Sequence, residues 1–189
     1  MNVLITGACG GLGRVFAVEC GRRGYNLFLT DINAKGLLPL QEGLERQFDS
    51  KVKSIACDLT NTESVDEMLA FIDKEGICFD MLLNVAGLDY EGEFLRRERE
   101  TVTHIVSLND EATMRITHAI LSRRRKGTRF TLVFVSSLAS MVPMPLKATY
   151  AASKRFLLDF SISLRQELKS QDVNVLALCP GGLVRMKMQ

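Results

Sequence analysis

The sequence lacks the features that would point to secretion or to a membrane. It has no run of apolar residues long enough to cross a bilayer, and no signal-peptide pattern opens it. Its cysteines are odd in number and none forms a CxxC pair, which favours reduced thiols in a cytosol over a disulfide framework. They are Cys9, Cys20, Cys57, Cys78 and Cys179. We therefore expect a cytoplasmic protein with no membrane partner.

An excess of charge is also absent, since 24 lysines and arginines stand against 22 aspartates and glutamates. The net charge of +2 creates no field over the whole protein for nucleic acid. The basic run at residues 123–126 precedes Gly127, and we favour a solvated helix end there over a polyanion site, because cations stabilise a helix C-terminus. His104 and His118 have no carboxylate or cysteine cluster at ligand spacing, so we expect no metal site.

What the sequence does contain is an alternation of short apolar runs with longer segments of helical periodicity. Strands are predicted at residues 3–6, 26–30, 52–57, 81–83, 131–136 and 173–178. Helices are predicted at residues 12–23, 35–48, 62–74, 97–124 and 149–169. This alternation implies right-handed crossovers between parallel strands. We therefore predict an α/β fold with a Rossmann-like doubly wound parallel sheet, in a single domain that spans residues 1–189.

A glycine-rich segment at residues 6–13, TGACGGLG, joins the first predicted strand to the first helix. Backbone N–H groups and the positive end of a helix at such a turn can bind a phosphate, although many such turns use glycine only structurally. Gly7 and Gly11 permit close backbone approach, and Gly13 permits close packing of the helix. The helix end could lower the pKa of the Cys9 thiol, but we favour a small space-filling role. The predicted cofactor contacts here are Gly7, Cys9, Gly10, Gly11, Leu12 and Gly13.

Asp31 ends the second predicted strand, eighteen residues after Gly13. An acidic residue at this place can accept hydrogen bonds from the ribose hydroxyls of an adenosine, and it repels the extra phosphate of NADP. The prediction is therefore NAD, with Asp31 as a cofactor contact. A simple turn or cap residue is the alternative interpretation of Asp31, and the nearby cations Arg14 and Lys35 keep NADP as the alternative cofactor.

Tyr150 and Lys154 are four residues apart on a predicted helix, so their side chains share one face. An isolated tyrosine, with a pKa of about 10, is a poor base at neutral pH, but a neighbouring ammonium favours its phenolate form. The pair is therefore able to exchange a proton with a substrate oxygen. This spacing alone is common in helices, where it usually marks a surface pair.

In combination, these segments resemble the short-chain dehydrogenase/reductase family over residues 1 to about 185. The segment at residues 6–13 matches the family's TGxxxGxG cofactor turn, and residues 84–87 stand for its NNAG segment, with Val85 in place of the second asparagine. Asn109, Ser137, Tyr150 and Lys154 have the order and spacing of its catalytic tetrad. The further cofactor contacts that the resemblance implies are Asp58, Leu59, Asn84, Ala86, Gly87, Tyr150, Lys154, Pro180 and Gly181.

The resemblance implies an NAD(P)(H)-dependent oxidoreductase that acts on a small alcohol or carbonyl substrate. Tyr150 would be the general acid or base, and Lys154 would bind the nicotinamide ribose. Ser137, rather than Ser136, would hydrogen-bond the substrate oxygen, and Asn109 would hold a water that links Lys154 to solvent. Without the resemblance, we would interpret Ser137 as a buried strand-end serine and Asn109 as a helix residue that bonds its own backbone.

The C-terminal part of the sequence departs from the family pattern. Arg185 stands where relatives usually have a threonine, and the sequence stops at Gln189, without the family's usual last strand and helix. An NAD-binding but catalytically disabled truncated relative, or an interaction module, is therefore the alternative function. The resemblance also implies a homodimer through the two long helices, not a tetramer. The apolar residues of these helices exceed what one sheet face needs, although some of them simply cover that sheet; they include Ile116, Ile120, Phe156 and Phe160.

Overall fold

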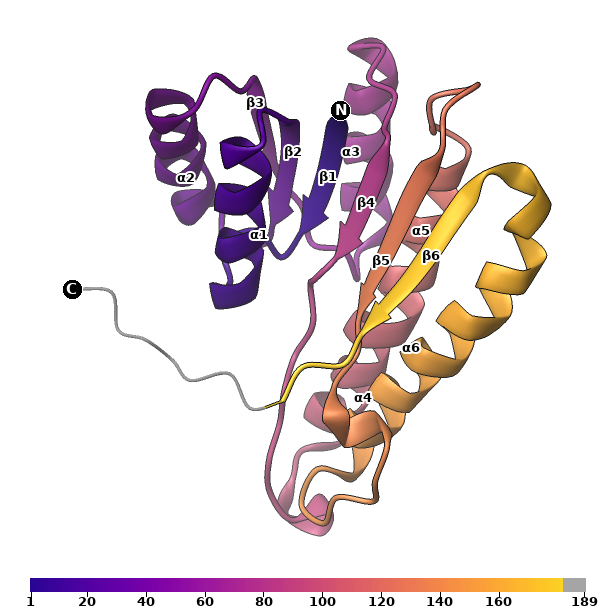
Figure 1. Ribbon diagram of the computed structural model, residues 1–189. Coiled ribbons are helices and arrows are strands. Elements are labelled where there is room, and N and C mark those ends of the chain that lie inside the picture. Colours follow the sequence, from indigo (N-terminus) through magenta and orange to yellow (C-terminus); the bar gives the residue numbers. More distant parts are fainter. Residues whose placement is uncertain (182–189) are drawn as a thin grey trace.

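Six strands of the computed structural model, which describes residues 1–181, form one parallel sheet (Figure 1). The strands are β1 (Asn2–Thr6), β2 (Asn26–Asp31), β3 (Val52–Ala56), β4 (Met81–Asn84), β5 (Phe130–Val135) and β6 (Val173–Leu178). Their order across the sheet is β3-β2-β1-β4-β5-β6, and every neighbouring pair is parallel. The predicted α/β fold with a doubly wound sheet is confirmed.

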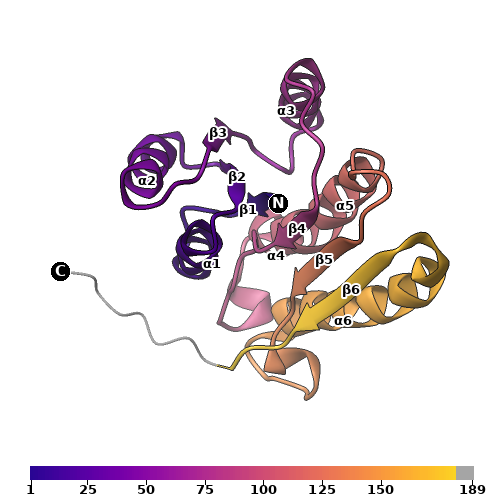
Figure 2. The same cartoon turned by 45° about the horizontal axis from the view of Figure 1, so that its top comes forward.

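Helices cover both faces of this sheet (Figures 1 and 2). They are α1 (Gly11–Arg22), α2 (Ala34–Gln47), α3 (Thr62–Lys74), α4 (Arg99–Val106), α5 (Thr113–Leu121) and α6 (Ala148–Glu167). Buried residues of α1 and α2 pack with one face of the sheet, and those of α3, α5 and α6 pack with the other. Short 3₁₀ turns are η1 (Phe94–Arg96), η3 (Leu138–Ser140) and η4 (Lys169–Gln171). Because both faces are covered, the strands are rich in consecutive apolar residues.

The predicted helix at residues 97–124 is not one regular helix. It consists of α4, a π-helical turn η2 (Ser107–Ala112) and α5. A π turn places one more residue in the turn than an α-helix does, and such turns occur often at functional sites. Here it contains Asn109 and Asp110, both buried. Hydrophobic periodicity does not reveal such a turn, because the residues on either side remain helical.

The two helical segments predicted to form a dimer interface, now seen as α4–α5 and α6, expose less apolar surface than expected. Ile116 and Ile120 on α5 are fully buried in the core of their own chain, so these two residues cover the sheet and are not available to a second copy. Phe156 on α6 is 37% exposed, and its ring stacks on that of Phe160. Of the four residues, Phe156 therefore offers the most surface.

The order of the strands reverses at β1 and β4, because the chain moves outward from β1 in one direction and from β4 in the other. Loops that follow these two strands separate toward opposite faces, and ligands of doubly wound folds bind in the crevice between them. The segments brought together here follow the carboxyl ends of all six strands. In the part of the chain that the structure describes, no helix is both apolar enough and long enough to span a membrane.

Candidate active site

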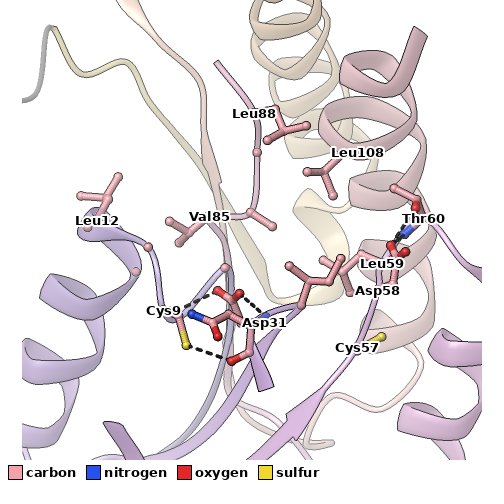
Figure 3. A pocket seen from close by; sticks show the side chains of 18 of the residues that line it. Cys9, Leu12, Asp31, Cys57, Asp58, Leu59, Thr60, Val85, Leu88 and Leu108 are labelled. Atoms are coloured by element: carbon pink, nitrogen blue, oxygen red, sulfur yellow. Dashed lines mark hydrogen bonds between the residues drawn. The ribbon is translucent and has the colours of Figure 1, made fainter. Parts of the chain in front are cut away.

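Two adjoining cavities lie at the carboxyl edge of the sheet, with volumes of about 590 and 570 Å³. The first lies between the glycine-rich turn, the end of β2 and the segment after β3 (Figure 3). The second lies beside the end of β5 and the start of α6. Both are lined by Leu12, Val85, Gly87 and Leu88. Because they share these lining residues, the two cavities join into one groove.

Glycine occupies each position of this turn for a different structural reason. Gly7 has a positive φ of 64°, which favours glycine. An added Cβ would lie 2.7 Å from the Cα atom of Ala86, so the backbone of Gly7 closely approaches the loop after β4. A Cβ on Gly13 would lie 2.1 Å from the carbonyl oxygen of Gly7, which confirms the predicted close packing of α1. An added Cβ on Gly11 would meet no atom within 4 Å among the described residues. Gly11 therefore leaves the open side of the turn accessible.

The first turn of α1 presents backbone N–H groups to the first cavity. Its N-cap residue is Gly10, so no side chain of the described chain satisfies these donors. Gly10, Gly11, Leu12 and Gly13 all line the cavity. A helix N-terminus with unsatisfied donors and a positive dipole end is suited to a phosphate.

Asp31 supports the glycine-rich turn as well as facing the cavity. One of its carboxylate oxygens accepts a 2.8 Å hydrogen bond from the backbone N–H of Cys9 (Figure 3). The other accepts a 2.9 Å bond from the N–H of Asn33. Because a carboxylate has about four acceptor positions, Asp31 retains capacity for hydroxyl donors of a ligand. The alternative interpretation of Asp31 as a turn residue and the predicted cofactor contact are therefore compatible.

The Cys9 thiol is not activated by the helix end. Burial, and then the charge of Asp31, raise its pKa above the usual value, although Arg14 acts in the opposite direction. The possibility of a lowered pKa is thus wrong, and the small space-filling role remains. Arg14 itself donates a 2.9 Å hydrogen bond to the Cys9 carbonyl, and neither Arg14 nor Lys35 lines the first cavity.

Asp58 and Leu59, two of the cofactor contacts that the resemblance implies, line the first cavity (Figure 3). Asp58 accepts hydrogen bonds from the backbone N–H and the hydroxyl of Thr60, at 2.9 and 2.7 Å, and these bonds lower its pKa. Leu59 is 6% exposed. Thr60 also lines the cavity but was not predicted, because its role depends on the conformation of this loop.

The segment after β4 is fastened to β1 by Thr6. Its hydroxyl oxygen accepts hydrogen bonds from the backbone N–H groups of Val85 and Ala86, at 3.0 and 3.1 Å. Ala86 and Gly87 line the first cavity, but Asn84 does not. The Asn84 side chain donates a 3.0 Å bond to the hydroxyl of Thr117 on α5. The structure thus turns this predicted contact away from the groove, and its side chain holds β4 against α5.

Gly87 lies between two residues of the predicted tetrad. A Cβ at this position would lie 3.0 Å from the amide oxygen of Asn109 and 3.2 Å from the Nζ atom of Lys154. These distances are shorter than ordinary carbon contacts, so a side chain here would displace one of the two groups. Glycine therefore keeps this part of the groove open.

Asn109 is fully buried in the π turn and fastens it to two other segments. Its amide oxygen accepts a 2.8 Å bond from the N–H of Leu88. Its amide nitrogen donates to the carbonyl of Leu88 and to the hydroxyl of Ser153, at 3.1 and 3.0 Å. Both amide donors are therefore used within the protein. The alternative that this side chain bonds its own backbone is therefore wrong, and the expected water between Asn109 and Lys154 stays a prediction.

The two consecutive serines after β5 have different environments. Ser136 is 1% exposed, and its hydroxyl donates a 2.7 Å bond to the carbonyl of Lys154. Ser137 is half-buried, lines the second cavity and accepts a 3.1 Å bond from the N–H of Ala139. Its hydroxyl proton is available to a ligand, which supports the choice of Ser137 over Ser136.

Tyr150 and Lys154 lie on the first turns of α6 and both line the second cavity. The Nζ atom of Lys154 is 5.8 Å from the centre of the Tyr150 ring and donates a 2.9 Å bond to the carbonyl of Val135. The lysine is 4% exposed. Burial lowers its pKa to about 8, and the charges of Asp110 and Asp89 partly oppose this effect.

A second lysine beside the tyrosine was missed by sequence reasoning. Lys147 lines the second cavity, and its Nζ atom lies 5.4 Å from the centre of the Tyr150 ring. It binds both carboxylate oxygens of Asp89, at 2.9 and 2.8 Å, and this carboxylate raises its pKa. No sequence signal links Lys147 to Asp89, which lies 58 residues earlier in the chain.

The C-terminal motif residues complete the wall of the second cavity. Pro180 and Gly181 both line it, and the carbonyl of Pro180 accepts a 3.0 Å bond from the N–H of Leu138. Arg185, which stands at the family's threonine position, lies outside the described residues. Within residues 1–181, no three side chains of histidine, cysteine, aspartate or glutamate gather as a metal site would require.

Comparisons with known proteins agree with this geometry. A family model described as short chain dehydrogenase matches residues 1–189. The very-long-chain 3-oxoacyl-CoA reductase of Neurospora crassa is 36% identical over 179 residues, which cover 91% of this chain and 53% of that protein. The chain therefore spans about half the length of this curated relative.

Solved structures extend the comparison to the fold. The bulky-bulky ketone specific alcohol dehydrogenase from Comamonas testosteroni superimposes with a TM-score of 0.90 at 26% identity, over 100% of this chain and 75% of that chain. A short-chain dehydrogenase from Sphingobium yanoikuyae in complex with NADPH gives 0.87 at 27% identity, over 97% and 71%. The groove, the motifs and these matches together show that the chain belongs to the short-chain dehydrogenase/reductase family of oxidoreductases.

Proposed function

We propose that this chain transfers a hydride between a nicotinamide cofactor and the carbon of an alcohol or carbonyl group, with Tyr150 as the general acid or base. The observation that supports this most strongly is the placement of Tyr150 beside the buried Lys154, in a cavity that adjoins the phosphate-binding turn. A bound nicotinamide would supply the hydride, and the protein provides orientation and proton transfer.

The described residues fit such a cofactor. The open side of Gly11 and the uncapped start of α1 suit a pyrophosphate, and Asp31 retains acceptor positions for ribose hydroxyls. Leu59 offers an apolar surface at the adenine end of the groove. At the other end, the Lys154 ammonium has donors beyond the one that it gives to Val135, and these can hold further hydroxyls.

We propose NAD(H) as the preferred cofactor. Asp31 brings a negative charge to the place where NADP would carry its extra phosphate, and like charges repel there. Arg14, the nearest candidate cation, is held on the Cys9 carbonyl and does not line the first cavity. The relative from Sphingobium yanoikuyae was solved with NADPH, so the two cofactors have to be compared directly.

For the chemistry, Tyr150 would exchange a proton with the substrate oxygen, and Ser137 would donate a hydrogen bond to the same oxygen. A positioned donor and a proton-transfer group stabilise the charge that develops on that oxygen. Lys154 keeps positive charge beside the tyrosine, which favours its deprotonated form. Apolar side chains form much of the second cavity, among them Leu138, Val142 and Met144.

We propose a 3-oxoacyl thioester or another ketone with an apolar arm as the substrate, because relatives act on 3-oxoacyl-CoA and on bulky ketones. The test follows nicotinamide absorbance at 340 nm while the purified chain is mixed with NADH and either a 3-oxoacyl thioester or a bulky ketone. Turnover that is lost in Tyr150→Phe supports the proposal. Tight NADH binding without turnover on any carbonyl would favour the disabled, cofactor-binding alternative.

A further inference from the structure

Asp110 is a buried carboxyl group with an unusual lack of partners. It follows Asn109 in the π turn and is 7% exposed. Its Oδ1 atom is buried and has no hydrogen-bond partner in the described part of the chain. A buried carboxylate without a donor is costly, so the folded protein favours its protonated form. In agreement, burial raises the pKa of Asp110 to about 7.

The π turn that carries this carboxyl packs against α6, the helix that carries the proposed catalytic lysine. Asn109 donates to Ser153 on α6, and one methyl group on Gly87 would touch both the Asn109 amide oxygen and the Nζ atom of Lys154. Asp110 is the next residue of this turn after Asn109. Each of the two charges acts on the pKa of the other, as expected for buried groups on two segments that pack together. Both are more than nine-tenths buried, so water screens their interaction little.

Few other charges compete for this interaction. The π turn packs against α4, α5 and α6. Their titratable or charged side chains include His104, Arg115, Tyr150, Lys154 and Arg155, and the turn itself also carries Glu111. Among these, Lys154 is the one whose charge acts on Asp110. Arg115 is paired with Glu111 through Nη2 at 2.7 Å, and its Nη1 atom is buried without a partner in the described part of the chain. Lys154 in turn interacts with Asp110 and, from the loop after β4, with Asp89.

We propose that Asp110 is a positioning residue for the reaction: a buried carboxyl that shares a proton equilibrium with Lys154 and thereby sets the charge that this lysine presents to Tyr150. When Asp110 loses its proton, its negative charge holds Lys154 in the ammonium form. When Asp110 is protonated, this negative charge is absent, and the burial of Lys154 then favours the neutral amine over the ammonium form. The two groups therefore titrate as a coupled pair.

The kinetic part of this inference rests on the proposed function, but its electrostatic part does not. NMR of protein that carries ¹³C-labelled lysine and aspartate follows both groups in the free chain, without substrate or cofactor. The Lys154 signal is assigned by its loss in Lys154→Arg, and the Asp110 signal by its loss in Asp110→Asn. We expect the Asp110 carboxyl carbon to titrate near neutrality, together with a step in the Lys154 signal.

In Asp110→Asn, the lysine loses the negative charge that favours its ammonium form. The midpoint of the Lys154 titration should then fall by about one pH unit, which is the usual size for the loss of a nearby opposite charge. If the proposed reaction holds, the alkaline limb of the pH profile of kcat should move to lower pH in the same variant. Asp110→Glu should restore part of the shift.

Glu111→Gln is the matched control, since it removes one negative charge from the same turn but from a side chain that is 60% exposed. This control should leave the Lys154 midpoint in place. An equal shift in Glu111→Gln, or an unchanged midpoint in Asp110→Asn, would overturn the proposal. So would an Asp110 carboxyl that titrates at ordinary acidic pH in the unsubstituted protein, a result that no folding defect of a variant can obscure. If the unsubstituted protein turned over no carbonyl substrate while its Asp110 and Lys154 signals still titrated together, that result would count against the proposed function alone.

Discussion

The carboxylate of Asp31, at the end of β2, accepts a 2.8 Å hydrogen bond from the backbone N–H of Cys9 in the glycine-rich turn. This bond joins the group proposed to select the cofactor to the loop proposed to hold its phosphates. Removal of the charge therefore affects both selection and loop geometry. Experiments on Asp31 need to separate these two effects.

We predict that the chain binds NADH more tightly than NADPH and that Asp31→Asn reduces this preference. The asparagine removes the repulsive charge, and because only its carbonyl oxygen accepts, it can keep one but not both of the bonds now given by Cys9 and Asn33. NADH affinity should fall about tenfold, equivalent to about 1.4 kcal/mol. Calorimetric titration with both cofactors measures this change.

The control for this prediction is Asp66→Asn, which removes an exposed charge from α3. It should leave both affinities unchanged. Thermal unfolding of Asp31→Asn then reports how far the turn itself is weakened. Equal or tighter binding of NADPH by the unsubstituted protein would contradict the assignment of Asp31.

We predict that Tyr150→Phe lowers kcat by about 10² to 10⁴, the usual contribution of a general acid or base, and leaves cofactor affinity nearly unchanged. Lys154→Ala should lower both, because the lysine is proposed to bind the ribose and to act on the tyrosine. Steady-state kinetics and cofactor titration distinguish the two patterns. Tyr25→Phe is the control, because it removes a hydroxyl group from a residue that lines neither cavity. Substantial activity in Tyr150→Phe would refute the proton-transfer role.

We predict that Gly87→Ala lowers kcat about tenfold, because a shift of a few tenths of an ångström in a reacting group is costly. Its Cβ would lie 3.2 Å from the Nζ atom of Lys154 and 3.0 Å from Asn109. Gly43→Ala, inside α2, meets no described atom within 4 Å and should stabilise the protein by about 0.5 to 1 kcal/mol without loss of activity. Full activity in Gly87→Ala would show that the site tolerates the added methyl group.

We predict that Asp110→Asn stabilises the folded chain at pH 8 but not at pH 4. The pKa of Asp110 is raised from 3.8 to about 7, so its contribution to stability is present below pH 4 and is lost as the pH rises toward 7. By linkage, the difference reaches at most about 4 kcal/mol. Urea unfolding at several pH values measures it, and parallel stability curves for the two proteins would contradict the prediction.

We predict a two-fold dimer in solution through the α4–α5 segment and α6. Apolar side chains remain exposed on these helices, with Met114 and Phe156 both 37% exposed and Ile162 54% exposed. A two-fold interface that buries such residues is the commonest arrangement of identical chains. Light scattering coupled to size exclusion should give twice the mass of the chain, and Phe156→Glu should weaken the dimer. A clean monomer or a stable tetramer would contradict this prediction.

The sequence was sufficient for the features that depend on local patterns. Consecutive apolar runs such as those in β4 and β5 identify strands buried on both faces, and six of them alternating with helices leave few topologies. The glycine-rich turn was identifiable because its residues are consecutive. Tyr150 and Lys154 were identifiable because four residues make about one turn of a helix.

Only the tertiary structure decided what each polar side chain contacts. Asn84 and Asn109 have the same side chain, yet one holds Thr117 and the other holds Leu88 and Ser153. The π turn that places Asp110 near Lys154 leaves no trace in the hydrophobic period. Periodicity records which face of an element is buried, whereas hydrogen bonds and charge interactions depend on which other segment meets that face. For this protein, the sequence therefore determined the fold and the location of the groove, and long-range packing determined the environment of each group within it.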